Sequence, residues 1–248
     1  MDDSKTVEIQ CTMRPIDRAK VHSQRNSATE QAITTNWSGY VAAPSLQQSI
    51  PNSVSYVAGS WIVPKLLPTT DLSYCTIWAG IDGFLDGTIA QIGTGHDWID
   101  SIQSNYAWFE MYPMGTLELE GFLVNIGDQI GVHIGYKGSD VFKLVIYNYT
   151  QGVSTTVPSS YTTVPNFQRS SAEWIVEAPF AEMVLSLADF KLATFNYCSA
   201  TINGVTGGIN NGNWVDDSIQ MTGTSGVKAN PSALLKNGTS FTVTWEHE

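Results

Sequence analysis

The chain has 248 residues, of which 42% are hydrophobic and 14% charged, and its 12 basic and 23 acidic residues give a net charge of −11. This composition indicates a globular chain with a sizeable core and excludes a disordered one. The scarcity of basic residues argues against a nucleic-acid partner, because phosphate binding requires a cationic surface. No stretch approaches the roughly 18 apolar residues that span a bilayer, so we also expect no membrane partner.

Residues 1–33 are polar and show no clear hydrophobic period, which predicts an arm or the remnant of a pro-segment. Basic residues are concentrated here, namely Lys5, Arg14, Arg18, Lys20 and Arg25. Two interpretations stay open for this arm. It is either an inhibitory segment that covers the site of an acidic body and is released in acid, or a disordered tail. We place a single domain at residues 34–248.

From Thr34 onward, short β-like runs alternate with turn signals such as Asp82-Gly83 and Lys137-Gly138. The predicted strands are 39–43, 54–63, 74–81, 87–92, 106–112, 129–136, 142–148, 173–177, 191–201 and 239–245. One short helix is predicted within residues 181–190. Many short strands at this spacing predict an all-β fold, an antiparallel sandwich or barrel.

The predicted strand at 173–177 carries acids inside an apolar run. Side chains alternate between the faces of a strand, so Glu173, Ile175 and Glu177 share one face and Trp174 lies on the other, where we expect it to pack in the core. Glutamate is a poor strand former and needs a reason to stand here. Taken alone, the segment is explained by a solvated face; the segments that follow favour a functional site.

Three other predicted strands contain polar or aromatic side chains in unusual places. Gln91 stands in an apolar run, where a buried amide costs about 1–3 kcal/mol unless its hydrogen bonds are satisfied. The run 106–113 places Trp108, Glu110 and Tyr112 on one face, an aromatic surface interrupted by one acid. A third run contains Trp78 and ends in an Asp-Gly turn.

Seven segments in this order resemble the glutamic peptidase (eqolisin) family. They are Asn36-Trp-Ser-Gly-Tyr40, Trp61-Ile-Val-Pro64, Trp78-Ala-Gly-Ile-Asp-Gly83, Gln91-Ile-Gly93, Ala107-Trp-Phe-Glu-Met-Tyr-Pro113, Gly127-Asp128 and Ala172-Glu-Trp-Ile-Val-Glu177. The resemblance runs from about Asn36 to Phe190. It implies two packed antiparallel sheets, a lectin-like β-sandwich with a concave substrate groove. It also implies an exported endopeptidase that is active in acid and uses a glutamine–glutamate dyad.

Carried over to this chain, the resemblance implies that the dyad is Gln91 with Glu177, and Glu173 is the alternative glutamate within the same motif. It places Trp37, Trp78, Asp82, Glu110 and Tyr112 among the substrate-binding residues, with Glu173 as a further one. A single carboxylate can act first as base and then as acid, and an uncharged amide can donate to the oxyanion that develops. This chain has Asn105-Tyr106 where fungal members usually have Tyr-Asp, so one acid near the groove is missing.

Other hydrolase classes find little support. A Ser-His-Asp site requires a histidine beside a nucleophilic serine, but the sequence has no Gly-x-Ser-x-Gly elbow, and we expect His96 to be a loop residue exposed to solvent. No HExxH motif is present, and Asp86, Asp97 and Asp100 do not have the spacing of an EF-hand calcium loop. We therefore expect no metal and no cofactor. The serious alternative is a non-catalytic carbohydrate- or peptide-binding module, in which Trp78, Trp108 and Tyr112 would stack on a ligand.

Several expectations concern processing and location. Cys75 and Cys198 could form a disulfide in an exported chain, which would leave Cys11 unpaired. Asn36, Asn148 and Asn237 are glycosylation acceptors if the chain follows a eukaryotic secretory route. We expect an exported monomer whose leader is not visible in this chain and whose partners are protein or peptide substrates.

Overall fold

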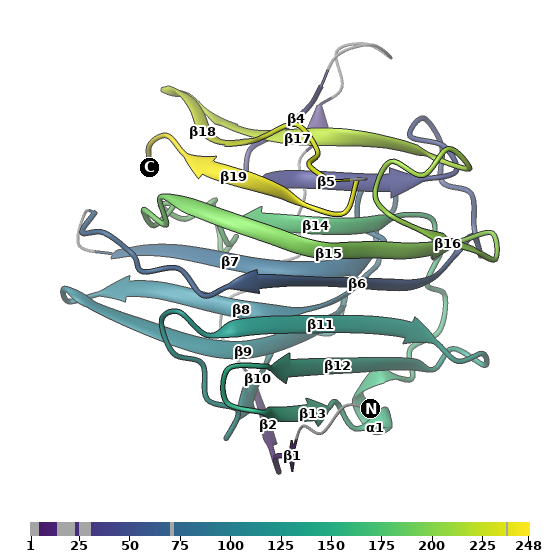
Figure 1. The fold of residues 1–248 in the computed structure, drawn as a ribbon, viewed down its shortest axis with the longest axis horizontal. Coiled ribbons are helices and arrows are strands. Elements are labelled where there is room, and N and C mark those ends of the chain that lie inside the picture. The colour runs from purple at the N-terminus through teal and green to yellow at the C-terminus, as the bar shows by residue number, and fades with distance from the viewer. Residues whose placement is uncertain (1–4, 14–22, 25–30, 70–71, 237) are drawn as a thin grey trace.

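The computed structural model describes residues 5–13, 23–24, 31–69, 72–236 and 238–248. Nearly all of its regular elements are strands, which hydrogen-bond in one continuous sheet that folds into two packed layers (Figure 1). Its one short helix in the described residues is α1 (Ser159–Thr162). The all-β prediction of packed antiparallel sheets is confirmed, apart from the parallel pairs β1–β13 and β4–β17.

The first layer contains the strands of the Gln91 and Glu177 motifs. From one edge to the other, its strands are β2 (Gln10–Met13), β10 (Leu117–Glu120), β9 (Ile102–Tyr112), β8 (Ile89–Ile99), β7 (Leu72–Ile81), β14 (Ala172–Glu177), β5 (Trp37–Ala43), β17 (Val215–Gly223), β4 (Ala32–Thr34) and β3 (Ser23–Gln24).

The second layer packs on one face of the first. Its strands are β1 (Lys5–Thr6), β13 (Val153–Thr156), β12 (Phe142–Asn148), β11 (Gln129–Tyr136), β6 (Val54–Ile62), β15 (Leu192–Ile202), β19 (Phe241–Trp245) and β18 (Gly226–Pro231), with β16 (Val205–Gly207) paired to β15. The β17–β18 pair joins the two layers.

The main core lies between the layers and is built from alternate residues of facing strands. Trp174 illustrates the alternation, because its side chain is buried in this core and its indole N–H donates to the carbonyl of Ala58 on β6 at 2.8 Å. The core role predicted for Trp174 is therefore confirmed. It follows that Glu173 and Glu177, its neighbours in the alternation, lie on the other face of the first layer.

A second apolar cluster covers that other face of the first layer. It includes Trp37, Trp78, Trp108 and Ile175 from the strands and Phe84 from the turn after β7. The first layer is thus buried on both faces, and every residue of β14 is buried. The interpretation of the two glutamates as a solvated face is therefore wrong.

Two local expectations are corrected. The predicted helix within residues 181–190 does not form, because this segment pairs instead with strand neighbours: Leu187 bridges Tyr74, and the amide of Ala188 donates to the carbonyl of Tyr74 at 3.0 Å. Cys75 and Cys198 are buried free thiols rather than a disulfide. Both lie in the core, where a free cysteine behaves as a small apolar residue.

The described parts of residues 1–33 are attached to the body rather than free. Strand β1 pairs with β13, and β2 extends the first layer beyond β10. Strand β4 spans the expected boundary between arm and domain and pairs with β17, near the opposite edge of the same layer. Residues 14–22 and 25–30, which include the predicted basic positions Arg14, Arg18, Lys20 and Arg25, lie outside the described residues.

Candidate active site

The strand register places the acid and amide side chains of three strands, β14, β8 and β9, on one face of the first layer. Glu173 on β14 pairs with Gly80 on β7, Gly80 pairs with Gln91 on β8, and Gln91 pairs with Glu110 on β9. These residues form one row across the layer. Glu177 lies on the same face but four residues farther along β14, in the row of Thr76. The sequence-predicted dyad therefore occupies one face, with Gln91 and Glu177 in different rows.

Glu177 is held by hydrogen-bond donors at both carboxylate oxygens. The indole N–H of Trp78 donates to Oε2 at 2.8 Å, and the side-chain amide of Asn36 donates to Oε1 at 3.3 Å. Donors that point at a carboxylate stabilise its charged form, which offsets part of the cost of burial. The geometry thus fixes an oriented carboxylate inside a fully buried surface.

Gln91 is oriented by the acid beside it. Its Nε2 donates to Glu110 Oε2 at 2.7 Å across the β8–β9 pair. An amide nitrogen has two hydrogens, so this bond leaves the second one available. The amide oxygen of Gln91 is buried and has no hydrogen-bond partner among the described residues. Gln91 can therefore present one donor and one acceptor to a bound group.

Glu173 differs from Glu177 although both are completely buried on the same strand. Burial raises the pKa of Glu173 well above its ordinary value, and the charges of Asp82 and Asp86 raise it further, while the Ser171 hydroxyl opposes them. Both oxygens of Glu173 lack a hydrogen bond of normal geometry within the described part of the chain. The raised pKa of this carboxyl consequently favours its neutral form.

Asp82 joins the end of β7 to the segment that precedes β14. Its carboxylate accepts the backbone N–H groups of Arg169 and Ser170, each at 2.6 Å. Burial raises its pKa to about 7, with the charge of Asp86 adding to the shift and the two backbone donors opposing it. Asp86 in turn accepts the Ser170 hydroxyl at 2.5 Å. The structure thus places Asp82, predicted as a substrate-binding residue, in a buried clamp beside Glu173.

Aromatic rings fill the face around these polar groups, and two glycines make room for them. Trp37 and Trp78 meet edge to face with ring centroids 4.8 Å apart. A Cβ on Gly80 would come within 2.9 Å of the Trp78 ring, and one on Gly95 within 2.1 Å of the Tyr106 ring. Glycine in these strands therefore allows the rings to lie flat on the sheet. Trp108 belongs to the same cluster, and Tyr112 packs against it.

Several buried polar atoms on this face have no partner in the described residues. Besides the oxygens of Gln91 and Glu173, they are the hydroxyl of Thr76 and the indole N–H of Trp37. A buried polar group without a hydrogen bond costs about 1–3 kcal/mol, so native structures usually explain such atoms by a ligand, water or a functional role. Thr76 pairs with Glu177, and Trp37 also pairs with Glu177, which places both atoms in the row of the oriented carboxylate.

The structure also shows residues whose role was missed or misjudged. Asn36 was expected only as a glycosylation acceptor, but it is buried and donates to Glu177. Its place immediately before Trp37 in the quoted motif was the available signal. His96 was expected as an exposed loop residue and is instead buried on β8, where its ring bonds to Thr94 and Asn105 at 3.0 and 2.9 Å. Strand β8 continues past Gly95, and side chains alternate along it, so His96 points to the face opposite Gln91, toward the core between the layers.

Metal and membrane features are limited in the part of the chain that the structure describes. There, no group of three or more His, Cys, Asp or Glu side chains is arranged to hold a metal ion. No described helix is long and apolar enough to cross a membrane.

Comparison with known proteins gives a consistent result. The model of the Peptidase A4 family matches residues 35–245. Aspergillopepsin-2 of Aspergillus niger is 27% identical over 241 residues, which cover 89% of this chain and 80% of that protein. Scytalidopepsin B of Scytalidium lignicola is 26% identical over 187 residues, which cover 72% and 68% of the respective chains.

Solved structures show the same fold. The crystal structure of aspergilloglutamic peptidase from Aspergillus niger has 27% identity and a TM-score of 0.62, covering 70% of this chain and 99% of that one. Scytalido-glutamic peptidase, solved with a peptide-based transition-state analogue, has 21% identity and a TM-score of 0.67, covering 86% of this chain and 98% of that one.

Proposed function

Because the chain belongs to the Peptidase A4 family and is a glutamic peptidase, we propose that it is an endopeptidase in which Glu177 is general base and acid and Gln91 stabilises the oxyanion. The observation that supports this assignment most strongly is the pair of oriented side chains on one buried face. Glu177 is fixed by Trp78 and Asn36, and Gln91 is fixed by Glu110. Each group comes from a different strand, and each has its own positioning partner.

In the proposed chemistry the carboxyl group of Glu177 changes its protonation state, and the amide of Gln91 does not. Ionised Glu177 takes a proton from a water molecule as the water oxygen attacks the scissile carbonyl carbon. The negative charge that develops on the carbonyl oxygen is stabilised by the second N–H of Gln91, which the bond to Glu110 leaves unused. Glu177 then returns the proton to the leaving nitrogen as the C–N bond breaks. Gln91 Oε1 accepts a hydrogen bond from the attacking water.

Glu177 is preferred over Glu173 as the base because the base must begin ionised. Burial, together with the charges of Asp82 and Asp86, raises the pKa of Glu173 and so favours its neutral form. Glu177 instead has a donor at each oxygen. Glu173 shares the row of Gln91, however, so the register alone does not exclude it. Substitution of each glutamate by glutamine separates the two assignments.

We propose that four further residues bind the peptide or position the dyad, namely Trp37, Trp78, Glu110 and Tyr112. Trp78 does both, since its N–H holds Glu177 while its ring lies over Gly80, which belongs to the row of Gln91. The unpartnered hydroxyl of Thr76 supports a ligand that supplies hydrogen bonds, as a peptide backbone does. Asp82 is proposed to act indirectly, by fixing the approach to β14.

An acidic working range is proposed from the carboxyl groups of this face. Asp82 has its pKa raised to about 7, chiefly by burial, and Glu173 is raised as well. The raised pKa values of Asp82 and Glu173 favour their neutral forms in acid, and this effect is lost as the pH rises. The direct test is a peptide-hydrolysis assay at pH about 3–5, where an ordinary glutamate titrates, with the wild type and Gln91→Ala side by side. Activity that survives the substitution would remove Gln91 from the mechanism.

We also propose that residues 1–33 restrain the enzyme. The described strands β2 and β4 attach this arm near opposite edges of the layer that carries Gln91 and Glu177. The site residues are fully buried, so a substrate reaches them only after covering segments move. A chain that lacks residues 1–30 is expected to hydrolyse peptides faster than the full chain at neutral pH and equally fast in acid. Equal rates across the whole pH range would contradict an inhibitory role.

The chain is further proposed to act as an exported monomer. The support is compositional, since only 14% of its residues are charged and its surface must be covered largely by uncharged polar side chains. Size-exclusion chromatography and fractionation of the source culture test these two statements. A dimer at assay concentration, or retention inside the cell, would contradict them.

A further inference from the structure

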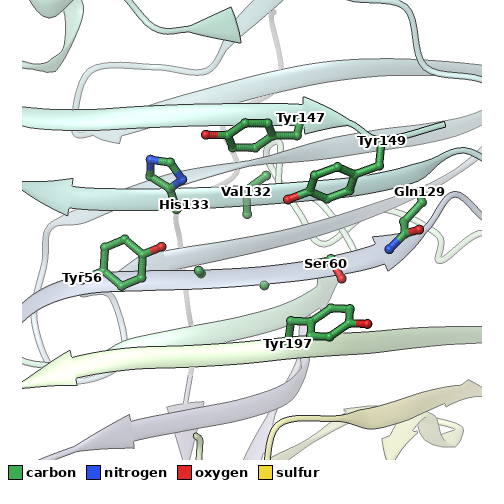
Figure 2. A pocket seen from close by; sticks show the side chains of 10 residues that line it. Tyr56, Ser60, Gln129, Val132, His133, Tyr147, Tyr149 and Tyr197 are labelled. Carbon is green, nitrogen blue, oxygen red and sulfur yellow. The ribbon is translucent and has the colours of Figure 1, made fainter. Parts of the chain in front are cut away.

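A cavity of about 280 Å³ opens on the outer face of the second layer, on β6, β11, β12 and β15. Its walls are mainly tyrosine rings, with His133 among them (Figure 2). This face is the side of the second layer that turns away from the core and from the Gln91–Glu177 face. The cavity therefore has no part in the proposed mechanism, and a ligand there would leave the peptide site free.

Small residues form the floor of the cavity and tyrosines form its walls. Ala58, Gly59 and Ser60 on β6 line the cavity, and Ser60 pairs with Gly131 on β11. A Cβ on Gly131 would come within 2.5 Å of the Tyr149 ring, so glycine allows this ring to lie flat against the strand. Glycine inside a strand weakens the strand and often marks close approach of another group. Here it creates an aromatic shelf at the rim of the cavity.

The rings are arranged as stacking surfaces. The rings of Tyr147 and Tyr149 are nearly parallel, with an interplanar angle of 6° and centroids 5.6 Å apart. His133 lies between Tyr56 and Tyr147, with centroid distances of 5.8 and 5.7 Å. Figure 2 shows the hydroxyls of Tyr56 and Tyr149 pointing toward one another across the cavity. The result is a set of ring faces with hydroxyl groups at their edges.

Tyr197 is placed at the rim by an irregularity of the backbone. The register between β15 and β6 shifts between Asn196 and Ser199, and Tyr197 adopts φ 54 in this bulge. Positive φ is unfavourable for a bulky side chain, and bulges near functional sites commonly redirect a side chain. The ring is 74% exposed, so packing in the protein does not explain the strained conformation.

The polar groups of the cavity define the charge and hydrogen-bonding character of its ligand. Among the residues that the structure describes, no Asp, Glu, Lys or Arg lines the cavity, although the chain carries a net charge of −11. The lining hydroxyls, the Gln129 amide and the His133 ring can each both donate and accept hydrogen bonds. Sugar hydroxyls have the same dual character, and a pyranose ring also has an apolar C–H face that stacks on aromatic rings. A fixed pattern of donors or acceptors, as a peptide backbone would need, is not what this lining offers.

We propose that this cavity binds a neutral hexose unit of an oligosaccharide, stacked on the tyrosine shelf. Its volume is slightly below the range of about 300–1,000 Å³ usual for small-molecule sites, which fits one sugar unit of a longer chain. The inference is independent of the dyad assignment. The rings of Tyr149 and Tyr197 at the rim provide faces for stacking on the sugar. The hydroxyls around the small-residue floor provide hydrogen bonds to it.

The experiment is a calorimetric titration of the full chain with cellohexaose, mannohexaose and chitohexaose. At least one is expected to bind with Kd at or below about 1 mM. Tyr197→Gly is the sharpest variant, because glycine accepts φ 54 without strain and the fold should be as stable as before. Loss of one stacking contact should weaken binding about two- to tenfold in Tyr197→Gly and in Tyr149→Ala.

The matched control is Tyr161→Ala, since Tyr161 is also partly exposed but stands on α1, outside the cavity. It should bind sugar as the wild type does, and all three variants should hydrolyse peptides at the wild-type rate. The proposal is overturned if none of the three sugars binds at about ten times that concentration. It is also overturned if the two cavity variants bind unchanged, or if a proline-rich peptide binds more tightly with the same dependence on Tyr197.

Discussion

The two layers use the same alternation of side chains and differ in what they do with polar and aromatic groups. On the first layer both faces are buried, and β14 has no exposed residue. On the second layer β11 has three partly exposed residues, Gln129, His133 and Tyr136, among its buried ones. Acids in the first layer and exposed tyrosines in the second are each costly for folding alone. Both departures from an ordinary sandwich indicate binding surfaces, one for the chemistry and one for a second ligand.

The largest expected effect comes from the oriented carboxylate of the first layer. Glu177→Gln keeps the shape of the side chain but cannot take up a proton, so kcat/KM for a peptide should fall about 10²–10⁴-fold. Glu173→Gln should stay within about tenfold of the wild type, because the raised pKa of this carboxyl favours the neutral form that glutamine resembles. Steady-state kinetics of both variants, with Tyr149→Ala as an outer-layer control, measure the difference. A greater loss in the Glu173 variant would reverse the assignment.

The amide of the dyad should have the next largest effect. Gln91→Ala removes the proposed oxyanion donor and should lower kcat by about 10²–10³-fold. Glu110→Gln replaces the carboxyl group that fixes the amide and should have a smaller effect in the same direction. Single-turnover measurements separate this loss from changes in substrate binding. Unchanged kcat with a raised KM would make Gln91 a binding residue instead.

Trp78 tests how far the site depends on the orientation of Glu177. Trp78→Phe keeps an aromatic ring and deletes the N–H that donates to Glu177 Oε2. A hydrogen bond to a charged group contributes about 1.5–3 kcal/mol, so kcat/KM should fall about ten- to hundredfold. The acidic limb of the pH profile should also move to higher pH, because the carboxylate loses a donor. Trp108→Phe, in the same aromatic cluster, is the matched control, and an unmoved limb in Trp78→Phe would count against this role.

The smallest effect concerns stability, and its sign follows from Asp82. The folded-state pKa of about 7, raised chiefly by burial, lies above the ordinary value of 3.8. The folded chain therefore holds this proton more tightly, and the stability it contributes is complete below pH 3.8 and lost as the pH rises to about 7. The slope should approach about 1.4 kcal/mol per pH unit for one such group.

Urea unfolding between pH 3 and pH 8 measures this slope, and Asp82→Asn is the matched variant. Asparagine tolerates the positive φ of 76 at this position, and its single side-chain oxygen can still accept one of the Arg169 and Ser170 N–H groups. The variant should lose much of the decline in stability toward neutral pH. His133→Ala on the outer layer should keep the full decline. A wild-type protein that is more stable at pH 7 than at pH 4 would contradict the account.

The sequence allowed the fold to be predicted where periodicity was strong. The bounds of β11 and β12 agree with the predicted runs at 129–136 and 142–148, because alternation and turn residues define both ends. Strand β17 was missed, since its two aspartates and its serine hide the apolar positions. The expected helix within residues 181–190 failed because Leu187 bridges Tyr74 on β7 and Asp189 bridges Leu67, and no local pattern reveals these pairings.

The sequence indicated which residues of the candidate site share a face of their strand. It did not indicate which of them share a row across the layer. Alternation alone placed Glu173 and Glu177 on one face, and the register that puts Glu173 beside Gln91 depends on which residues of β7 pair with β14 and β8. Asn36 was missed as a partner of Glu177 because the contact joins residues 141 positions apart. Such contacts follow from tertiary packing and have no local signature.

The most direct measurement is a double-mutant cycle on the dyad. If Gln91 and Glu177 act on one water and one scissile bond, the rate of the double variant Gln91→Ala with Glu177→Gln should be within about threefold of the rate of the slower single variant. The losses of rate from residues that work as a unit do not add. A double variant whose loss equals the product of the two single losses would show that they act independently, and would contradict the shared mechanism.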